Sequence, residues 1–214
     1  MLDEGESLEW AARLGIPAPR AVELTADAVD GGLPFPGPYV VKVAAPALGH
    51  KSEAGGVLLG VADGRALTGA VARMAADVER ATGQVLERVR VAAQVTPLAE
   101  LMLGYRRDPV FGPVVILSAG GIDVELTETR AIRLAPVDEA TAAAMIDGLP
   151  LARRLAGYRG RAAADRRALV RAIVAMSAPG CDVIEAEINP LGAFEDGVLA
   201  LDALFVVEDK GEER

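Results

Sequence analysis

The sequence predicts an α+β protein with mixed sheets, built as two halves. Strand-like runs follow one another without strict alternation with helices, as in residues 89–95, 100–105 and 114–118. The apolar fraction is 51% and the aromatic fraction is 4%, so the predicted core consists mainly of small and branched aliphatic side chains. Thr96-Pro97 interrupts the predicted β structure, and we therefore expect one subdomain at residues 1–95 and a second at 96–214.

Capping residues and apolar spacing predict the individual elements. Residues 7–14 are expected to form a short helix with Ser7 as its N-cap and Gly15 at its end. Asp138 is expected to cap a helix that runs to about residue 147. The remaining predicted elements are strands at 39–44, 57–61, 89–95, 100–105, 114–118 and 132–134, helices at 66–82 and 165–177, and a terminal hairpin.

Composition and charge exclude several classes of function. The net charge of −9 argues against a nucleic-acid partner, because phosphate backbones require clusters of Lys and Arg. No apolar run reaches membrane-spanning length, and the acidic N-terminus lacks the pattern of a signal peptide. Cys181 is the single cysteine, so no intramolecular disulfide can form, and its apolar neighbours favour a buried position. We expect a cytoplasmic protein.

The terminal hairpin carries a candidate metal site. Glu187 and Asn189 are two residues apart and share one face of a strand. A turn at Asp196-Gly197 returns the chain. Asp202 then lies opposite Leu191 if the loop holds two residues and opposite Asn189 if it holds four, on that same face in both registers. Two carboxylates and an amide oxygen suit Mg²⁺ with nucleotide phosphates. The alternative is an acidic hairpin that faces solvent.

Three cationic or nucleophilic side chains are candidates for phosphate chemistry. Lys42 lies within an apolar strand, where it would be either a fixed cation facing a cleft or an ordinary solvent-facing lysine. His50 and Lys51 lie on a glycine-rich loop whose backbone amides can approach an anion closely. His50, the only histidine, could accept a phosphoryl group as a nucleophile, although a loop histidine is more often simply solvated.

Several further residues are weaker candidates for nucleotide contacts. Gly120 and Gly121 follow a predicted strand, where they form either a phosphate-contacting turn or a plain connection. Gln94 and Val95 could present amide and backbone groups to an adenine edge, and Glu100 could accept ribose hydroxyls. As isolated residues, the polar members of this set would more often be ordinary surface groups.

Taken in order, these segments resemble the ATP-grasp domain of NDP-forming acyl-CoA synthetases, in particular the β subunit of ADP-forming acetate–CoA ligase. The resemblance runs from about Leu8 to Ala203. The motifs that carry it are Gly15-Ile16-Pro17, Val40-Val41-Lys42-Val43, His50-Lys51-Ser52 with Gly55-Gly56-Val57, Asp108-Pro109-Val110-Phe111-Gly112-Pro113-Val114, Gly120-Gly121, Ala135-Pro136, Gly157-Tyr158-Arg159-Gly160 and Glu187-Ile188-Asn189-Pro190-Leu191. The sequence departs from the usual pattern at Glu53, Ser118 and Thr129.

The resemblance implies an ATP-grasp fold, in which two α+β subdomains hold a nucleotide in a cleft between them. It assigns Lys42 and Lys51 to phosphate contacts, Gln94 and Val95 to adenine, and Glu100 to the ribose. It assigns Asn189 and Asp202 to Mg²⁺, with Glu187 close by. It also makes His50 the loop histidine that carries phosphate between the nucleotide site and the active site of a partner subunit.

The function expected from this resemblance is that of a nucleotide-binding β subunit of an ADP-forming acyl-CoA synthetase, an acid–thiol ligase. Its reaction joins an acid and CoA at the expense of ATP, giving acyl-CoA, ADP and phosphate. With His50 as the single histidine and no CoA-binding domain in the 214 residues, the expected enzyme requires a separate α subunit. The alternative is a regulatory module that binds ATP or ADP without turnover.

Overall fold

The computed structural model describes residues 1–29, 32–44, 55–121 and 129–208. The predicted loop residues His50 and Lys51 lie outside the described residues. The chain forms two compact units, of which one comprises Met1–Ala18 and Thr96–Arg214 and the other Pro19–Val95. The two units are called here the large unit and the small unit.

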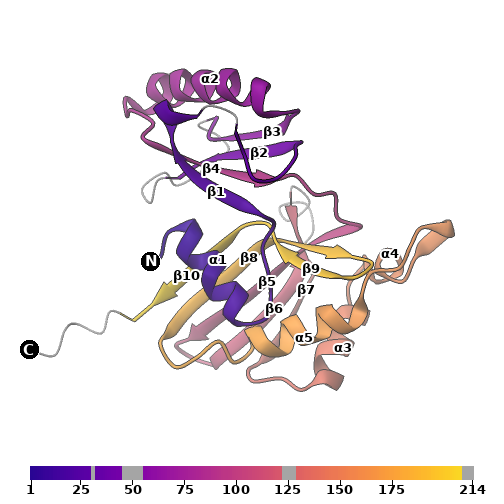
Figure 1. Cartoon of the computed structure of the whole chain (residues 1–214). Helices are drawn as coiled ribbons and strands as arrows, with labels where there is room; N and C mark the ends of the chain where they lie inside the picture. Colours follow the sequence, from indigo (N-terminus) through magenta and orange to yellow (C-terminus); the bar gives the residue numbers. More distant parts are fainter. Residues whose placement is uncertain (30–31, 45–54, 122–128, 209–214) are drawn as a thin grey trace, which may run out of the picture. The chain divides into compact units, whose positions relative to one another are not determined.

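The small unit is a four-stranded antiparallel sheet with one long helix on a face (Figure 1). In spatial order its strands are β1 (Ala21–Thr25), β4 (Arg88–Ala93), β2 (Tyr39–Val43) and β3 (Val57–Val61), and its helices are η1 (Ala26–Ala28) and α2 (Gly64–Thr82). Strand β1 has no counterpart among the predicted elements, because its five residues carry neither regular alternation nor a long apolar run.

Helix α2 has the sequence signals of an amphipathic helix at both ends and along its length. The Asp63 carboxylate accepts a hydrogen bond from Ala66 N at 2.9 Å and caps the first turn. Gly83 ends the helix with φ of 72°, in the left-handed region that glycine adopts without strain. The apolar residues spaced by three and four are all buried, which confirms the predicted helix; they are Leu67, Val71, Met74 and Val78.

The large unit is a six-stranded antiparallel sheet with helices packed against it (Figure 1). Its main path is β10 (Ala203–Val207), β8 (Val183–Phe194), β5 (Ala99–Asp108), β6 (Gly112–Ala119) and β7 (Arg130–Leu134), and β9 (Gly197–Ala200) also pairs with β8. Its helices are α1 (Glu4–Arg13), α3 (Glu139–Asp147), α4 (Ala152–Leu155), η3 (Tyr158–Gly160) and α5 (Arg166–Met176). Asp138 caps α3 as predicted, and hydrogen bonds from Thr141 hold the pKa of its carboxyl below the ordinary value.

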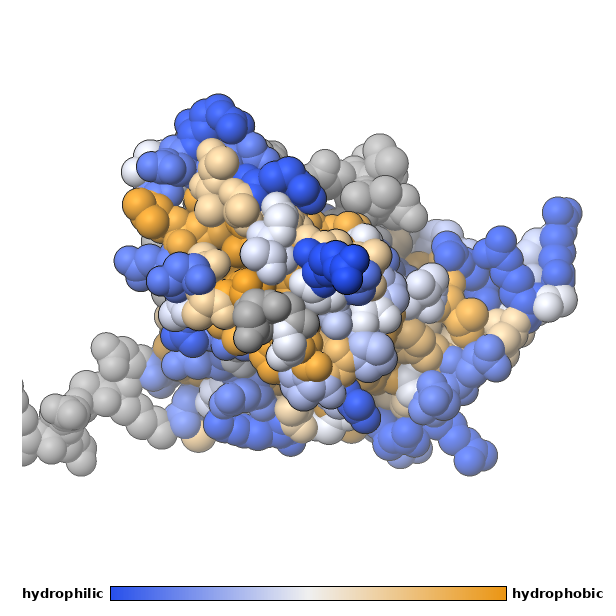
Figure 2. Space-filling model, turned by 45° about the horizontal axis from the view of Figure 1, so that its top comes forward, coloured by the Kyte–Doolittle hydropathy of each residue, from blue (hydrophilic) through white to orange (hydrophobic). Residues whose placement is uncertain are grey.

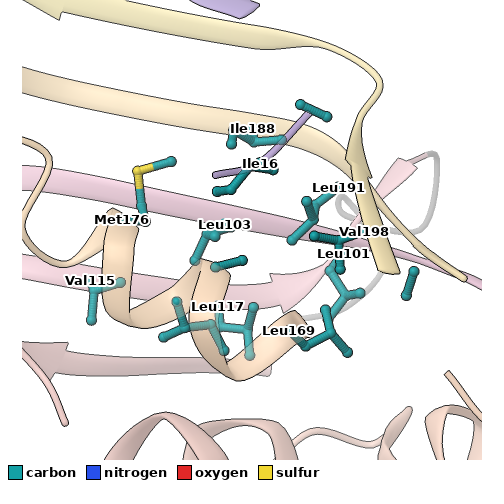
Figure 3. Packing of buried hydrophobic residues seen from close by; sticks show 14 of the residues in the cluster. Ile16, Leu101, Leu103, Val115, Leu117, Leu169, Met176, Ile188, Leu191 and Val198 are labelled. Atoms are coloured by element: carbon teal, nitrogen blue, oxygen red, sulfur yellow. The ribbon is translucent and has the colours of Figure 1, made fainter. Parts of the chain in front are cut away.

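One face of the large sheet is buried under helices. Leu101 and Leu103 of β5 and Leu117 of β6 are fully buried, and they belong to one cluster with Leu169 and Met176 of α5. Figure 3 shows these side chains from sheet and helix pointing into the same layer. The intervening strand residues therefore face away from this layer, as the period-two geometry of strands requires.

The first 18 residues pack with the C-terminal half, which differs from the expected subdomain of residues 1–95. Helix α1 lies against β10, where Trp10 stacks on Phe205 with ring centroids 6.0 Å apart. Ser7 was predicted as the N-cap, but Asp3 and Glu6 form a capping box instead. The Ser7 hydroxyl is fully buried and accepts a hydrogen bond from Phe205 N at 3.1 Å.

The burial prediction for Cys181 is wrong, because the residue is exposed in the turn between α5 and β8. Its apolar neighbours along the chain therefore did not indicate its own position. Across the described ranges, no helix combines the length and apolarity needed to cross a membrane.

The buried hydrogen bond of Ser7 makes the attachment of α1 testable. Ser7→Ala leaves the buried Phe205 N–H without its acceptor, and we expect a loss of about 1–3 kcal/mol in the free energy of unfolding. Urea denaturation monitored by circular dichroism measures this. Glu9→Ala, on the exposed side of the same helix, is the control, with an expected change within about 0.5 kcal/mol. Equal stability of the two variants would contradict the role of this bond.

Candidate nucleotide and metal site

The site is built around an irregularity in strand β8. Leu103 of β5 pairs with Ile188, whereas Leu101 pairs with Leu191, so β8 has one extra residue in the stretch Asn189-Pro190. A proline is tolerated there because a bulge does not require every backbone N–H for pairing. A bulge also changes the direction in which nearby side chains point, and Asn189 lies within this bulge.

The side chain of Asn189 connects two of the predicted site residues. Its amide oxygen accepts a hydrogen bond from Gly121 N at 3.3 Å. Its amide nitrogen donates to Glu187 Oε1 at 3.2 Å. The structure thus brings Gly121, which lies 68 residues before Asn189 in the chain, together with Asn189 and Glu187.

Gly120 and Gly121 allow the end of β6 to approach β5 closely. Gly120 N donates to Glu100 O at 3.0 Å, and a Cβ on Gly120 would collide with the backbone of Leu101. Gly121 has φ of 66°, and a Cβ there would collide with the Glu100 carboxylate. The backbone contact at Gly120 and the positive φ of Gly121 both favour glycine, and the close approach places Glu100 beside the Asn189 cluster.

Asp202 lies at the break between β9 and β10. The hairpin loop is Glu195-Asp196, since Phe194 pairs with Gly197, and Asn189 N donates to Asp202 O at 3.1 Å. Asp202 therefore lies opposite Asn189, but with a two-residue loop, so the predicted link between this register and a four-residue loop is wrong. Asp202 is half-buried, like Glu187 and Asn189.

The donor atoms of this cluster fit a hard divalent cation. Glu187 and Asp202 would supply carboxylates and Asn189 an amide oxygen, which is the oxygen chemistry that Mg²⁺ prefers. Among the described residues there is no cluster of three or more His, Cys, Asp or Glu side chains suited to a metal. A metal at this position would thus rest on two carboxylates, one amide and further oxygen ligands such as water and phosphate.

The small unit holds the remaining described candidates. Lys42 is half-buried on β2, directly across from Arg90 of β4. The side-chain oxygen of Gln94 accepts a hydrogen bond from Gly60 N at 2.6 Å, which fixes the orientation of its amide. Val95 is half-buried and ends the small unit.

Arg90 is a cation near Lys42 that the sequence did not single out. Its side chain is 17% exposed, and its guanidinium lies 3.5 Å from a Glu23 oxygen. Glu23 also pairs with Arg88 at 3.0 Å, so one carboxylate serves two arginines. The adjacency of Lys42 and Arg90 depends on strand register, and no local pattern indicates it.

Comparison with known proteins places the whole chain in one family. The ATP-grasp domain family matches residues 1–207. The chain is 34% identical over 180 residues to acetate–CoA ligase (ADP-forming) I of Archaeoglobus fulgidus, covering 82% of this chain and 26% of that protein. It is 30% identical to the β subunit of acetate–CoA ligase (ADP-forming) I of Pyrococcus furiosus, covering 96% of this chain and 91% of that subunit.

Solved structures agree with this placement. A dinucleotide forming acetyl-coenzyme A synthetase 1 of Ca. Korarchaeum cryptofilum, in complex with coenzyme A and Ca-AMPCP, has a TM-score of 0.85 at 26% identity, over 97% of this chain and 93% of that chain. A second structure of that synthetase has a TM-score of 0.80 at 27% identity, over 96% and 92% of the two chains. It contains Mg-AMPPCP, and its phosphohistidine segment points towards the nucleotide binding site.

The predicted ATP-grasp fold is thereby confirmed. The chain spans about a quarter of the length of the first of these relatives and nearly all of the β subunit. The chain therefore belongs to the ATP-grasp family, within the group that includes the β subunits of ADP-forming acetate–CoA ligases.

Proposed function

We propose that this chain is the nucleotide-binding β subunit of an ADP-forming acyl-CoA synthetase, an acid–thiol ligase. The observation that carries the proposal is the cluster of Glu187, Asn189 and Gly121, in a chain that matches a β subunit over 91% of that subunit's length. The proposed reaction is acid + CoA + ATP ⇌ acyl-CoA + ADP + phosphate.

In this proposal the small unit supplies the cation and the adenine contacts. Lys42 offsets charge on the nucleotide phosphates, as a preorganised cation does in phosphoryl transfer. The hydrogen bond from Gly60 N orients the Gln94 amide, so that Gln94 and Val95 meet the adenine edge. Lys51 would be a second phosphate contact, on the loop that the structure does not describe.

The large unit supplies the ribose and metal contacts. Glu100 accepts hydrogen bonds from ribose hydroxyls, and Gly120 and Gly121 let the β6 terminus approach the phosphates. The residues that would hold Mg²⁺ are Glu187, Asn189 and Asp202. When bound, the ion neutralises charge on the transferring phosphoryl group.

The remaining steps require a partner chain. His50 is proposed to accept the phosphoryl group and to carry it to an acyl-CoA-forming site on a separate CoA-binding α subunit. The Pyrococcus furiosus relative is itself named as a β subunit, and the Archaeoglobus fulgidus ligase is about four times the length of the matched region. Both observations support a division of the reaction between chains or domains.

A second candidate function is a regulatory module that binds ATP or ADP without turnover. It is supported by the same cluster of Glu187, Asn189 and Gly121, which would serve nucleotide binding without phosphoryl transfer. The two functions differ in one observable, because only the enzyme subunit transfers phosphate to His50.

The first prediction for this function concerns His50. Incubation with Mg-ATP labelled at the γ-phosphate should give an acid-labile, base-stable label on the wild-type chain, and His50→Ala should abolish it because the chain has no other histidine. The control is ATP binding measured by calorimetry, which should be similar in both proteins. Label that persists in His50→Ala would contradict the relay, and bound ATP without any label would favour the regulatory module.

The second prediction concerns Asp202. Asp202→Ala should reduce the Mg²⁺-dependent gain in ADP affinity by about tenfold or more, because it removes one of two carboxylates from the cation site. Calorimetry with ADP, with and without Mg²⁺, measures this gain. Asp196→Ala removes an exposed carboxylate from the tip of the same hairpin and serves as the matched control. If both variants keep the wild-type gain, Asp202 is not a ligand.

A further inference from the structure

A short arginine-rich segment of the large unit has no role in the proposed reaction. Residues 152–161, called here the arginine loop, contain four arginines and no acidic residue. The loop therefore carries +4 in a chain whose net charge is −9, and all other residues together carry −13. The four arginine residues are all exposed; they are Arg153, Arg154, Arg159 and Arg161.

The base of the arginine loop is fixed to the core. Ala164 N donates to Leu155 O at 2.9 Å, and both residues are buried, with 8% and 6% of their surface exposed. Gly157 N donates to Arg154 O at 3.1 Å. From this base the segment around α4 projects away from the sheet (Figure 1, orange).

The tip of the loop has a constrained backbone. Gly157 has φ of 83°, and a Cβ there would lie 2.8 Å from Arg161 O and 3.1 Å from Ala163 N. Arg159 has φ of 55° and is the only non-glycine residue with positive φ in the described part of the chain. Such a conformation persists only where the surrounding structure determines it, and it is found most often at functional segments.

Among the described residues, no carboxylate neutralises the charges of the loop. No described carboxylate lies within 4.0 Å of any of its four guanidinium groups, whereas the neighbouring Arg166 pairs with Asp147 at 2.6 Å. The Arg159 guanidinium lies over the Tyr158 ring, 5.2 Å from its centroid, and Tyr158 is 52% exposed. The loop therefore presents an aromatic ring and unneutralised cations to solvent.

The shape and charge of the arginine loop indicate which kind of molecule it would bind. A projecting segment encloses no small molecule, because ligand sites are concave (Figure 2, right-hand blue projection). Exposed Tyr and Arg are the residues that most often anchor protein interfaces. The surface thus fits an acidic protein.

We propose that the arginine loop docks on an acidic surface of the CoA-binding partner chain. This inference rests on the proposed function, since it assigns the surface by which the β subunit holds its partner. Complementary charge would steer the encounter of the two chains, and Tyr158 would add contact area that salt does not screen.

The test uses the full chain and the purified CoA-binding chain encoded with it. The loop variant is Arg153→Gln/Arg154→Gln/Arg161→Gln, and the matched control is Arg65→Gln/Arg73→Gln/Arg80→Gln, which removes three exposed arginines from α2. Calorimetry at several NaCl concentrations gives the Kd of each. The loop variant should bind at least about tenfold more weakly at low salt, with a shallower salt dependence, while the control should match wild type.

A third variant and a second readout separate the outcomes. Tyr158→Ala should weaken binding at both low and high salt, and Mg-ADP binding should be unchanged in every variant because no loop residue is assigned to the proposed nucleotide site. Equal Kd values for the loop variant and the control would overturn the docking surface while leaving the proposed function intact. Wild type that binds Mg-ADP but no partner chain would overturn both the surface and the two-chain enzyme. A loop that retains a labelled single-stranded RNA in place of the partner chain would overturn the surface alone.

Discussion

The hydrogen-bonded ladder of strand β8 is the constraint on which the large unit depends. β8 spans Val183–Phe194 and pairs with β5, β9 and β10, so it joins the C-terminal hairpin to the middle of the sheet. The extra residue at Asn189-Pro190 interrupts this ladder. The polar cluster lies at this irregularity, and a second register shift of β8, against Val206/Val207 of β10, lies near the start of the strand.

The polar cluster depends on close backbone approach as much as on its side chains. Gly120 and Gly121 bring the end of β6 against Glu100, and Gly121 N then reaches the Asn189 oxygen. A side chain at Gly120 would collide with the backbone of Leu101 and separate β5 from the end of β6, and one at Gly121 would displace the Glu100 carboxylate. The carboxylates and the amide are therefore held by a few tight contacts on a rigid sheet, an arrangement typical of preorganised anion and metal sites.

Charge is distributed unevenly over the chain, and the two kinds of site follow that distribution. The Asn189 cluster gathers acidic and amide groups at a break in the sheet, where a cation would complete it. The arginine loop does the opposite, since it collects cations on a projecting segment with no described carboxylate within ion-pair distance. The first arrangement suits a small ion and a nucleotide, and the second suits a macromolecular surface.

Local sequence determined the elements whose signals are local. Helix α2 and the cap at Asp138 follow from apolar spacing and a capping residue, and the face shared by Glu187 and Asn189 follows from strand alternation. The motifs, taken in order, also determined the ATP-grasp family, because several matches across one chain are far more specific than any single one.

Tertiary structure alone decided which distant segments meet. Helix α1 joins the C-terminal half because the buried Ser7 hydroxyl accepts a hydrogen bond from Phe205 N, 198 residues further along the chain. The contact of Gly121 with Asn189, the adjacency of Lys42 and Arg90, and the exposure of Cys181 depend likewise on register and packing. Local propensity carries no information on such pairings, since they are set by the mutual fit of strands far apart in the chain.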